Sequence, residues 1–163
     1  MDGVFSIRPA AADEMGSVAT LFRAYAGALG VDLSYQGFEA ELATLPGAYA
    51  PPNGTLLMAL SRAGNPVGCV GVRPLPEPGT CEMKRLHTTA AARGAGIGRA
   101  LAEAAIEAAK RAGYVAMRLD TLPAMIVAQT LYRDLGFEIT PPYYNSRVPG
   151  TIFMRKALGP PMR

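Results

Sequence analysis

The sequence is poor in the residues that build metal centres and disulfide frameworks. It has two cysteines and one histidine in 163 residues. Two cysteines are too few for the framework of a small secreted protein, and both lie in apolar, strand-like runs. We therefore expect Cys69 and Cys81 to be reduced core thiols, able to pair only if their strands are neighbours. His87 alone makes neither a zinc site nor a catalytic triad, so no metal is expected.

Long apolar runs and clusters of one charge are also missing. No uncharged apolar stretch reaches the roughly 18 residues that a membrane span needs, and Met1 to Phe5 lack the features of a signal peptide. The net charge is +3, but lysines and arginines do not cluster with exposed aromatic residues as in nucleic-acid-binding proteins. We therefore expect a cytoplasmic protein that binds neither membrane nor nucleic acid.

The pattern of apolar and turn residues indicates one α/β domain over residues 1–163. The expected order is strand 6–8, helix 11–29, helix 37–45, strands 56–60, 67–72 and 81–87, helix 97–112, strand 114–120, helix 124–135, and strands 137–139 and 152–154. The two short breaks between the three middle strands favour antiparallel hairpins. We therefore expect a mixed, mostly antiparallel central sheet flanked by helices on both faces.

The most informative segment is a glycine-rich loop between a strand and a long helix, Arg93-Gly94-Ala95-Gly96-Ile97-Gly98-Arg99. Its glycines allow close backbone approach, and the free N–H groups and dipole at the helix start form an anion site suited to a pyrophosphate. The loop lacks the Gly-Lys-Ser/Thr ending of a Walker loop, and its spacing differs from a dinucleotide-binding fingerprint. A glycine-rich turn without function is the alternative.

Two motifs resemble the GNAT superfamily, the Gcn5-related N-acetyltransferases. The pattern R-x-x-G-x-G at 93–98 resembles its acetyl-CoA loop, and A-x-x-L-Y-x-x-x-G-F at 128–137 resembles its later helix. The resemblance covers about residues 4 to 157 and includes the order of strands and helices. It implies the superfamily fold and an enzyme that binds acetyl-CoA and transfers the acetyl group to an amine.

A subgroup of small bacterial acetyltransferases is similar in three further stretches, E-M-K-R-L at 82–86, L-D-T at 119–121 and P-Y-Y-N at 142–145. Three positions depart from the wider pattern. Met125 stands where an asparagine often contacts the cofactor arm, so that contact is lost or replaced. Ala90 stands where a proline is common, and the subgroup has a tyrosine where this chain has His87.

The resemblance also implies a cofactor site and two catalytic residues. Tyr132 is expected to point at the thioester sulfur and to protonate the leaving thiolate, and a core tyrosine is the alternative. Glu82 is expected to be the base, directly or through a water, and a salt bridge with Lys84 or Arg85 is the alternative. The residues expected to bind acetyl-CoA are Leu86, His87, Thr88, Arg93, Gly94, Ala95, Gly96, Ile97, Gly98, Arg99, Ala128 and Tyr132.

The acceptor is expected beside the same strand. Lys84 or Arg85 could hold a substrate carboxylate, the arginine by a bidentate fork, and a solvated strand charge is the alternative. Strand alternation puts Glu82 and Lys84 on one face and Arg85 on the other, unless a bulge intervenes. The other residues expected to bind the acceptor, with packed surface loops as the alternative, are Tyr143, Tyr144, Asn145 and Tyr35.

These residues predict an acetyl-CoA-dependent N-acetyltransferase that transfers the acetyl group directly, without a metal or a covalent enzyme intermediate. The expected acceptor is the amine of a small metabolite or amino-acid-like molecule, and a protein N-terminus or lysine is the second class. The rivals are a non-catalytic acyl-CoA-binding or sensing domain on the same fold, and a partner-binding domain with a vestigial loop. The resemblance also suggests a homodimer.

Overall fold

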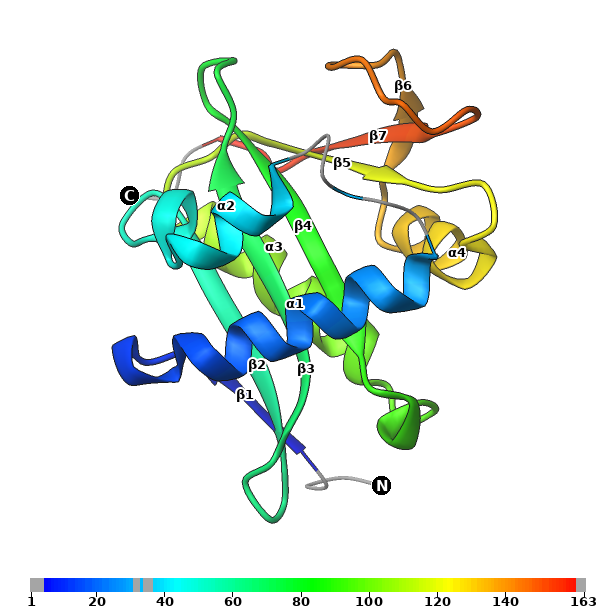
Figure 1. Cartoon of the computed structure of the whole chain (residues 1–163). Helices are drawn as coiled ribbons and strands as arrows, with labels where there is room; N and C mark the ends of the chain where they lie inside the picture. Colours follow the sequence, from blue (N-terminus) through cyan, green and yellow to red (C-terminus); the bar gives the residue numbers. More distant parts are fainter. Residues whose placement is uncertain (1–4, 31–32, 34–36, 161–163) are drawn as a thin grey trace.

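A seven-stranded sheet organises the part of the chain that the structure, a computed structural model, describes, residues 5–30, 33 and 37–160 (Figure 1). The order across the sheet is β1-β2-β3-β4-β5-β7-β6. The strands are β1 (Phe5–Pro9), β2 (Thr55–Ser61), β3 (Pro66–Pro74), β4 (Thr80–Thr88), β5 (Ala116–Thr121), β6 (Glu138–Thr140) and β7 (Ile152–Ala157). The α-helices are α1 (Met15–Leu29), α2 (Phe38–Ala43), α3 (Ile97–Arg111) and α4 (Ile126–Asp134).

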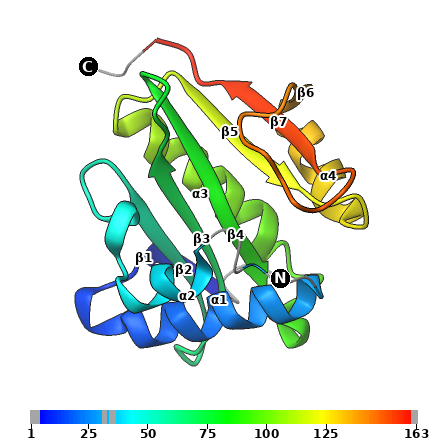
Figure 2. The ribbon, with the colours of Figure 1, turned by 45° about the horizontal axis from the view of Figure 1, so that its top comes forward.

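Strands β4 and β5 are parallel, whereas the other neighbouring pairs in this sheet are antiparallel. The two parallel strands pair at three positions only, from Thr80 opposite Ala116 to Glu82 opposite Arg118. Beyond these pairs they move apart, as Figure 2 shows for the green and yellow strands. The mixed, mostly antiparallel sheet is confirmed, and it opens into a fork between β4 and β5.

Helices cover both faces of the sheet, as predicted (Figure 2). Helices α3 and α4 contribute to one core cluster, which includes Leu101, Ala105, Met117 and Tyr132. Helices α1 and α2 contribute to another, which includes Val18, Phe22, Phe38 and Tyr49. None of the described helices is long and apolar enough to cross a membrane.

The predicted helices and strands are present, with shifted ends. The helix expected from residue 11 starts with a 3-10 turn, Ala12–Glu14, and becomes α-helical at Met15. The Glu14 carboxylate accepts the N–H of Ala11 (2.7 Å) and also binds Arg8 (2.6 Å), which fixes this entry. Helix α3 ends close to the predicted position because Gly113 has a φ of +94°, which glycine tolerates.

The two cysteines are free and buried, as expected. Cys81 belongs to the core cluster on the α3 side, and Cys69 belongs to the cluster on the α1 side. Their strands, β4 and β3, are neighbours, but the two thiols pack into opposite faces of the sheet.

A β-bulge at Arg85 interrupts β4 and determines on which face of the sheet this side chain lies. Arg85 has a φ of +62°, and the pairing of β3 with β4 shifts between Cys69 and Gly71. The extra residue turns the Arg85 side chain to the face that carries α1 and α2, where it contacts Glu41. Plain alternation would have sent Arg85 to the α3 face, so the bulge brings Lys84 and Arg85 to the same side.

Candidate active site

A backbone cradle forms where the glycine-rich loop enters α3. Gly94 and Gly96 have φ values of +89° and +80°, and a Cβ at either would meet no atom within 4 Å, so the loop is open to a ligand. The Gly96 carbonyl accepts the first hydrogen bond of the helix (3.1 Å), which leaves the N–H groups of 97–99 without a partner inside it. With the exposed Arg93 and Arg99, the cradle suits an anion such as a pyrophosphate.

A groove of about 750 Å³ leads from this loop past the end of β4 to the start of α4. Because β4 and β5 pair only as far as Glu82, the edge of β4 at residues 86–88 is left for the groove. Met125, at the expected asparagine position, also lines it, whereas Ala95 does not. The predicted cofactor residues that line the groove are Leu86, His87, Thr88, Arg93, Gly94, Gly96, Ile97, Gly98, Arg99 and Ala128.

The side chain of His87 lines this groove and is uncharged. Its ring lies edge-on to the ring of Tyr25, with centroids 6.4 Å apart. Burial, together with the charge of Arg93, lowers the pKa of His87 below its usual 6.5. The imidazole is therefore uncharged at neutral pH, which fits a residue beside the cofactor arm better than an acid.

A small cavity of about 10 Å³ inside the fork shares Tyr25, Leu86 and Met125 with the groove. Tyr132 of α4 lies in it, 6% exposed, with its ring edge-on to Phe137 at 5.8 Å between centroids. Burial first, and then the charges of Tyr25 and Asp120, raise the pKa of Tyr132 above 10, so it stays a neutral phenol. The residues that line this cavity are Tyr25, Met83, Lys84, Arg85, Leu86, Asp120, Met125 and Tyr132.

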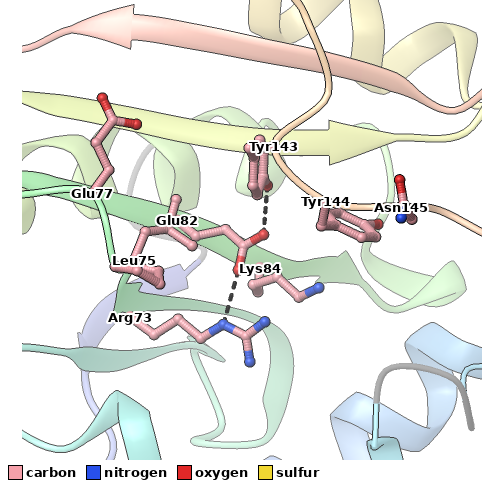
Figure 3. A pocket seen from close by; sticks show the side chains of 9 residues that line it. Arg73, Leu75, Glu77, Glu82, Lys84, Tyr143, Tyr144 and Asn145 are labelled. Carbon is pink, nitrogen blue, oxygen red and sulfur yellow. Dashed lines mark hydrogen bonds and ion pairs between the residues drawn. The ribbon is translucent and has the colours of Figure 1, made fainter.

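A second cavity, of about 510 Å³, shares no lining residue with the groove, and Figure 3 shows the side chains that line it. The segment between β6 and β7 supplies three of the predicted acceptor residues, Tyr143, Tyr144 and Asn145. Tyr143 and Tyr144 pack edge-on against Phe153 of β7, at 5.3 and 5.1 Å between centroids. The other residues that line this cavity are Arg73, Leu75, Pro76, Glu77, Glu82 and Lys84.

Glu82 is tied down in this second cavity. Arg73, directly opposite on β3, donates to Glu82 Oε1 at 2.8 Å, and the Tyr143 hydroxyl donates to Oε2 at 2.5 Å (Figure 3). The residue is 2% exposed. The alternative to the base role was a salt bridge with Lys84 or Arg85. The ion pair that Glu82 makes here is with Arg73, because register across the β3–β4 hairpin brings Arg73 to this carboxylate.

Lys84 belongs to both the fork cavity and the second cavity. It is 6% exposed, and burial lowers its pKa, while the charges of Glu82 and Asp120 act in the opposite direction. The predicted sharing of one face by Glu82 and Lys84 is confirmed, since both line the second cavity. A cation at this position lies where the two cavities meet.

Arg85 is engaged inside the protein. Its guanidinium donates to both oxygens of Glu41, at 3.0 and 3.1 Å, and lies over the rings of Tyr25 and Phe38. Its side chain is 1% exposed. The two donors of Arg85 that were predicted to bind a substrate carboxylate thus bind the carboxylate of Glu41 in α2. Of Lys84 and Arg85, Lys84 is therefore the better candidate for binding a substrate carboxylate.

Three charged residues of the site were not predicted from the sequence: Arg73, Asp120 and Glu41. Asp120 lay within the L-D-T stretch at 119–121, which was the one available signal. Its carboxylate accepts a hydrogen bond of 2.5 Å from the Tyr144 hydroxyl. Tyr35 lies outside the described residues. The described residues contain no group of three or more histidine, cysteine or acidic side chains suited to a metal ion.

Known proteins resemble this chain in sequence and in fold. The model of the acetyltransferase (GNAT) family matches residues 18–137. An uncharacterized N-acetyltransferase of Schizosaccharomyces pombe is 39% identical over 135 residues, which span 83% of this chain and 83% of that protein.

Two solved structures share the fold. A GNAT acetyltransferase from Staphylococcus aureus has a TM-score of 0.79 at 18% identity, over 95% of this chain and 99% of the other. A GNAT superfamily phosphinothricin acetyltransferase from Sinorhizobium meliloti, solved in complex with AcCoA, has a TM-score of 0.73 at 22% identity, over 96% and 89%. At these identities, the matches are evidence of a common fold.

Proposed function

Because the chain belongs to the acetyltransferase (GNAT) family, we propose that it transfers the acetyl group of acetyl-CoA to the amine of a small, amino-acid-like acceptor. The arrangement of the groove, the fork cavity and the second cavity supports this proposal most directly. The fork cavity around Tyr132 shares Leu86 and Met125 with the groove, and it shares Lys84 with the second cavity. A donor and an acceptor that enter from opposite sides would meet beside Tyr132.

The groove has the features that acetyl-CoA requires. The cradle at 93–99 offers N–H groups, a helix dipole and two arginines to a pyrophosphate. The free edge of β4 at 86–88 offers backbone groups to an extended, amide-containing arm. Bound there, acetyl-CoA would supply an activated acyl group as a thioester. Met125 lines the groove in place of the expected asparagine, so a thioether stands where an amide could have bonded the arm.

Tyr132 is the proposed acid for the leaving thiolate. At reference pKa values of about 10 for a phenol and about 8.5 for a thiol, the proton transfer is uphill by roughly 2 kcal/mol, which is accessible during catalysis. Glu82 was the predicted base. Since Glu82 is buried and each of its oxygens accepts a hydrogen bond, Glu82 would act on an acceptor through Tyr143 or a water.

The second cavity suits a small polar acceptor. It is walled by the Tyr143 and Tyr144 rings and contains a buried cation, Lys84, at its inner end. A carboxylate on the acceptor would be attracted to that cation, because opposite charges interact more strongly in a buried site than in water. An amino-acid-like molecule therefore fits this cavity better than a bare alkylamine.

Calorimetric titration with acetyl-CoA tests the cofactor site. We expect saturable binding to the wild-type protein and affinity at least about thirtyfold weaker for an Arg93→Ala/Gly96→Asp double variant, because a charge-assisted contact is lost and an anion enters a positive-φ position of the cradle. The matched control is Arg62→Ala, which removes an arginine outside the groove lining. Absence of wild-type binding at millimolar acetyl-CoA would overturn the proposed function.

Matched amines test the acceptor class. Thiol release is measured with each amino acid beside the amine that lacks its carboxylate. We expect kcat/KM to be about tenfold higher for the carboxylate-bearing member, as a hydrogen bond to a charged group is worth about 1.5 kcal/mol or more. Lys84→Met should remove the difference, and Lys110→Met, on the exposed side of α3, should keep it. Equal rates within the pairs for the wild type would refute a carboxylate-bearing acceptor.

A further inference from the structure

Two carboxylates lie near the point where β4 and β5 separate, and they differ in what surrounds them. Glu82 lies at the last paired position of the fork, opposite Arg118. It is almost fully buried, and each of its oxygens accepts a hydrogen bond, from Arg73 and from Tyr143. The Glu82 carboxylate therefore has a structural role, because it binds two side chains that line the second cavity.

Asp120 lies two residues further along β5, beyond the last pair with β4. It is partly exposed, and it lines the same cavity as Tyr132 and Lys84. One of its oxygens, Oδ2, accepts the Tyr144 hydroxyl at 2.5 Å. Tyr144 is itself held by edge-on contacts with the rings of Tyr143 and Phe153, at 5.5 and 5.1 Å between centroids. Asp120 is thus a carboxylate with a fixed orientation in the cavity where the donor and the acceptor would meet.

We infer that Asp120, oriented by Tyr144, is a catalytic residue that binds the acceptor nitrogen and takes one of its protons as the amide bond forms. The inference rests on the proposed function and extends it. The C–N bond forms as the C–S bond breaks. One proton of the attacking neutral amine passes to the Asp120 carboxylate, and the sulfur takes the proton of Tyr132. Proton return from Asp120 to Tyr132, directly or through solvent, restores both groups.

Charge development explains why a carboxylate helps at this place. A neutral amine becomes positive as it attacks, so a nearby carboxylate stabilises the transition state more than the neutral reactant. The proton leaves when the nitrogen has become acidic, so a carboxylate can accept it. Glu82 then acts as a positioning residue through Tyr143, on the wall of the second cavity.

Asp120→Asn tests the inference with the isosteric loss of charge. We expect kcat for thiol release with the best amine of the panel to fall about a hundredfold or more, the usual contribution of a general base. Acetyl-CoA affinity by calorimetry should change less than about threefold, because Asp120 does not line the groove. Asp134→Asn, at the exposed end of α4, is the matched control and should behave as the wild type.

The pH profile separates a base from a structural carboxylate. The fall of kcat on the acidic side should be present in the wild type and in Glu82→Gln, and absent in Asp120→Asn. Tyr144→Phe should keep that fall and lower kcat about threefold to tenfold, since loss of the hydroxyl lets the Asp120 carboxylate rotate. The titratable and charged groups around Asp120 that are unchanged in the Asp120→Asn comparison are Tyr25 of α1, Lys84 and Arg85 of β4, Tyr132 of α4, and Tyr143 and Tyr144 before β7.

The outcomes are distinct. Asp120→Asn with activity within threefold of the wild type, and with the acidic fall retained, would overturn the inference while acetyl transfer stands. Acetyl-CoA binding without turnover of any amine in the panel would favour a non-catalytic acyl-CoA-binding domain, and would remove the proposed function together with the inference. Absence of acetyl-CoA binding by the wild type would also remove the proposed function on which the inference rests.

Discussion

Replacing Tyr132 with phenylalanine is expected to lower kcat for acetyl transfer by two to three orders of magnitude, the usual contribution of a positioned general acid. The affinity for acetyl-CoA should stay within about threefold, because the ring and its contact with Phe137 remain. Steady-state thiol release gives kcat, and calorimetry gives the affinity. The variant therefore separates the chemical step from cofactor binding.

Burial makes Tyr132 a suitable acid although it raises the pKa of the phenol. The same burial would raise the pKa of a thiol in the same cavity, as it does for Cys69 and for Cys81, to about 12 in the latter. The difference between phenol and thiol thus stays near its reference value. A raised pKa also keeps Tyr132 protonated over the whole working range of pH, so its proton is always available.

Tyr114→Phe is the matched control for this variant. Tyr114 also loses a hydroxyl that makes a specific contact, a 2.6 Å hydrogen bond to the Asn53 carbonyl, but it lines none of the three cavities. Its kcat should equal that of the wild type. A Tyr132→Phe enzyme with kcat within threefold of the wild type would show that the hydroxyl is not the acid and that Tyr132 is a core tyrosine.

Local patterns in the sequence were sufficient to predict most of the fold. Periodicity and turn residues placed the helices and strands, and glycines before an alanine-rich helix placed the cradle at 93–99. These features depend on neighbours within a few residues of one another. Tyr132, too, was found from a short motif, and it lies in the cavity between the two proposed substrates.

Contacts between side chains on different strands could not be predicted in the same way. The pairing of Glu82 with Arg73 depends on the register of the β3–β4 hairpin, which a sequence does not reveal when the turn is long. The side on which Arg85 emerges depends on a single bulge. Asp120 lines the fork cavity because β5 separates from β4 after three pairs, and this separation depends on the arrangement of the whole sheet. The acceptor side of the site is therefore the part that required a structure.

Glu41→Gln is expected to lower the free energy of unfolding by about 3 kcal/mol, because it leaves a buried cation without its counter-charge. The Glu41 carboxylate accepts two hydrogen bonds from Arg85 and one, of 3.0 Å, from Tyr49. A glutamine would turn an N–H₂ donor toward these donors. Urea unfolding with an unchanged dependence on denaturant measures the loss.

A second glutamate of the same helix, which forms an exposed ion pair, provides the control. Glu39, also in α2, accepts two hydrogen bonds from Arg23, but the side chains are 72% and 58% exposed. Glu39→Gln should cost less than about 1 kcal/mol, as expected of a solvated ion pair. Equal losses for Glu39→Gln and Glu41→Gln would show that the helix, and not the buried pair with Arg85, determines the effect.

The effect of Glu41→Gln should also depend on pH. Burial by itself would raise the pKa of Glu41, but the hydrogen bonds and charge of Arg85, with Tyr49 and Arg73, outweigh it and hold the pKa below its usual 4.5. A lowered pKa in the folded state gives stability that is present above the unfolded pKa and is lost as pH falls through the folded one. The difference between wild type and variant should therefore shrink as the pH falls below the usual pKa of 4.5 and through the lower pKa of the folded state. A difference that stays constant over this range would mean that the Glu41 charge does not stabilise the fold.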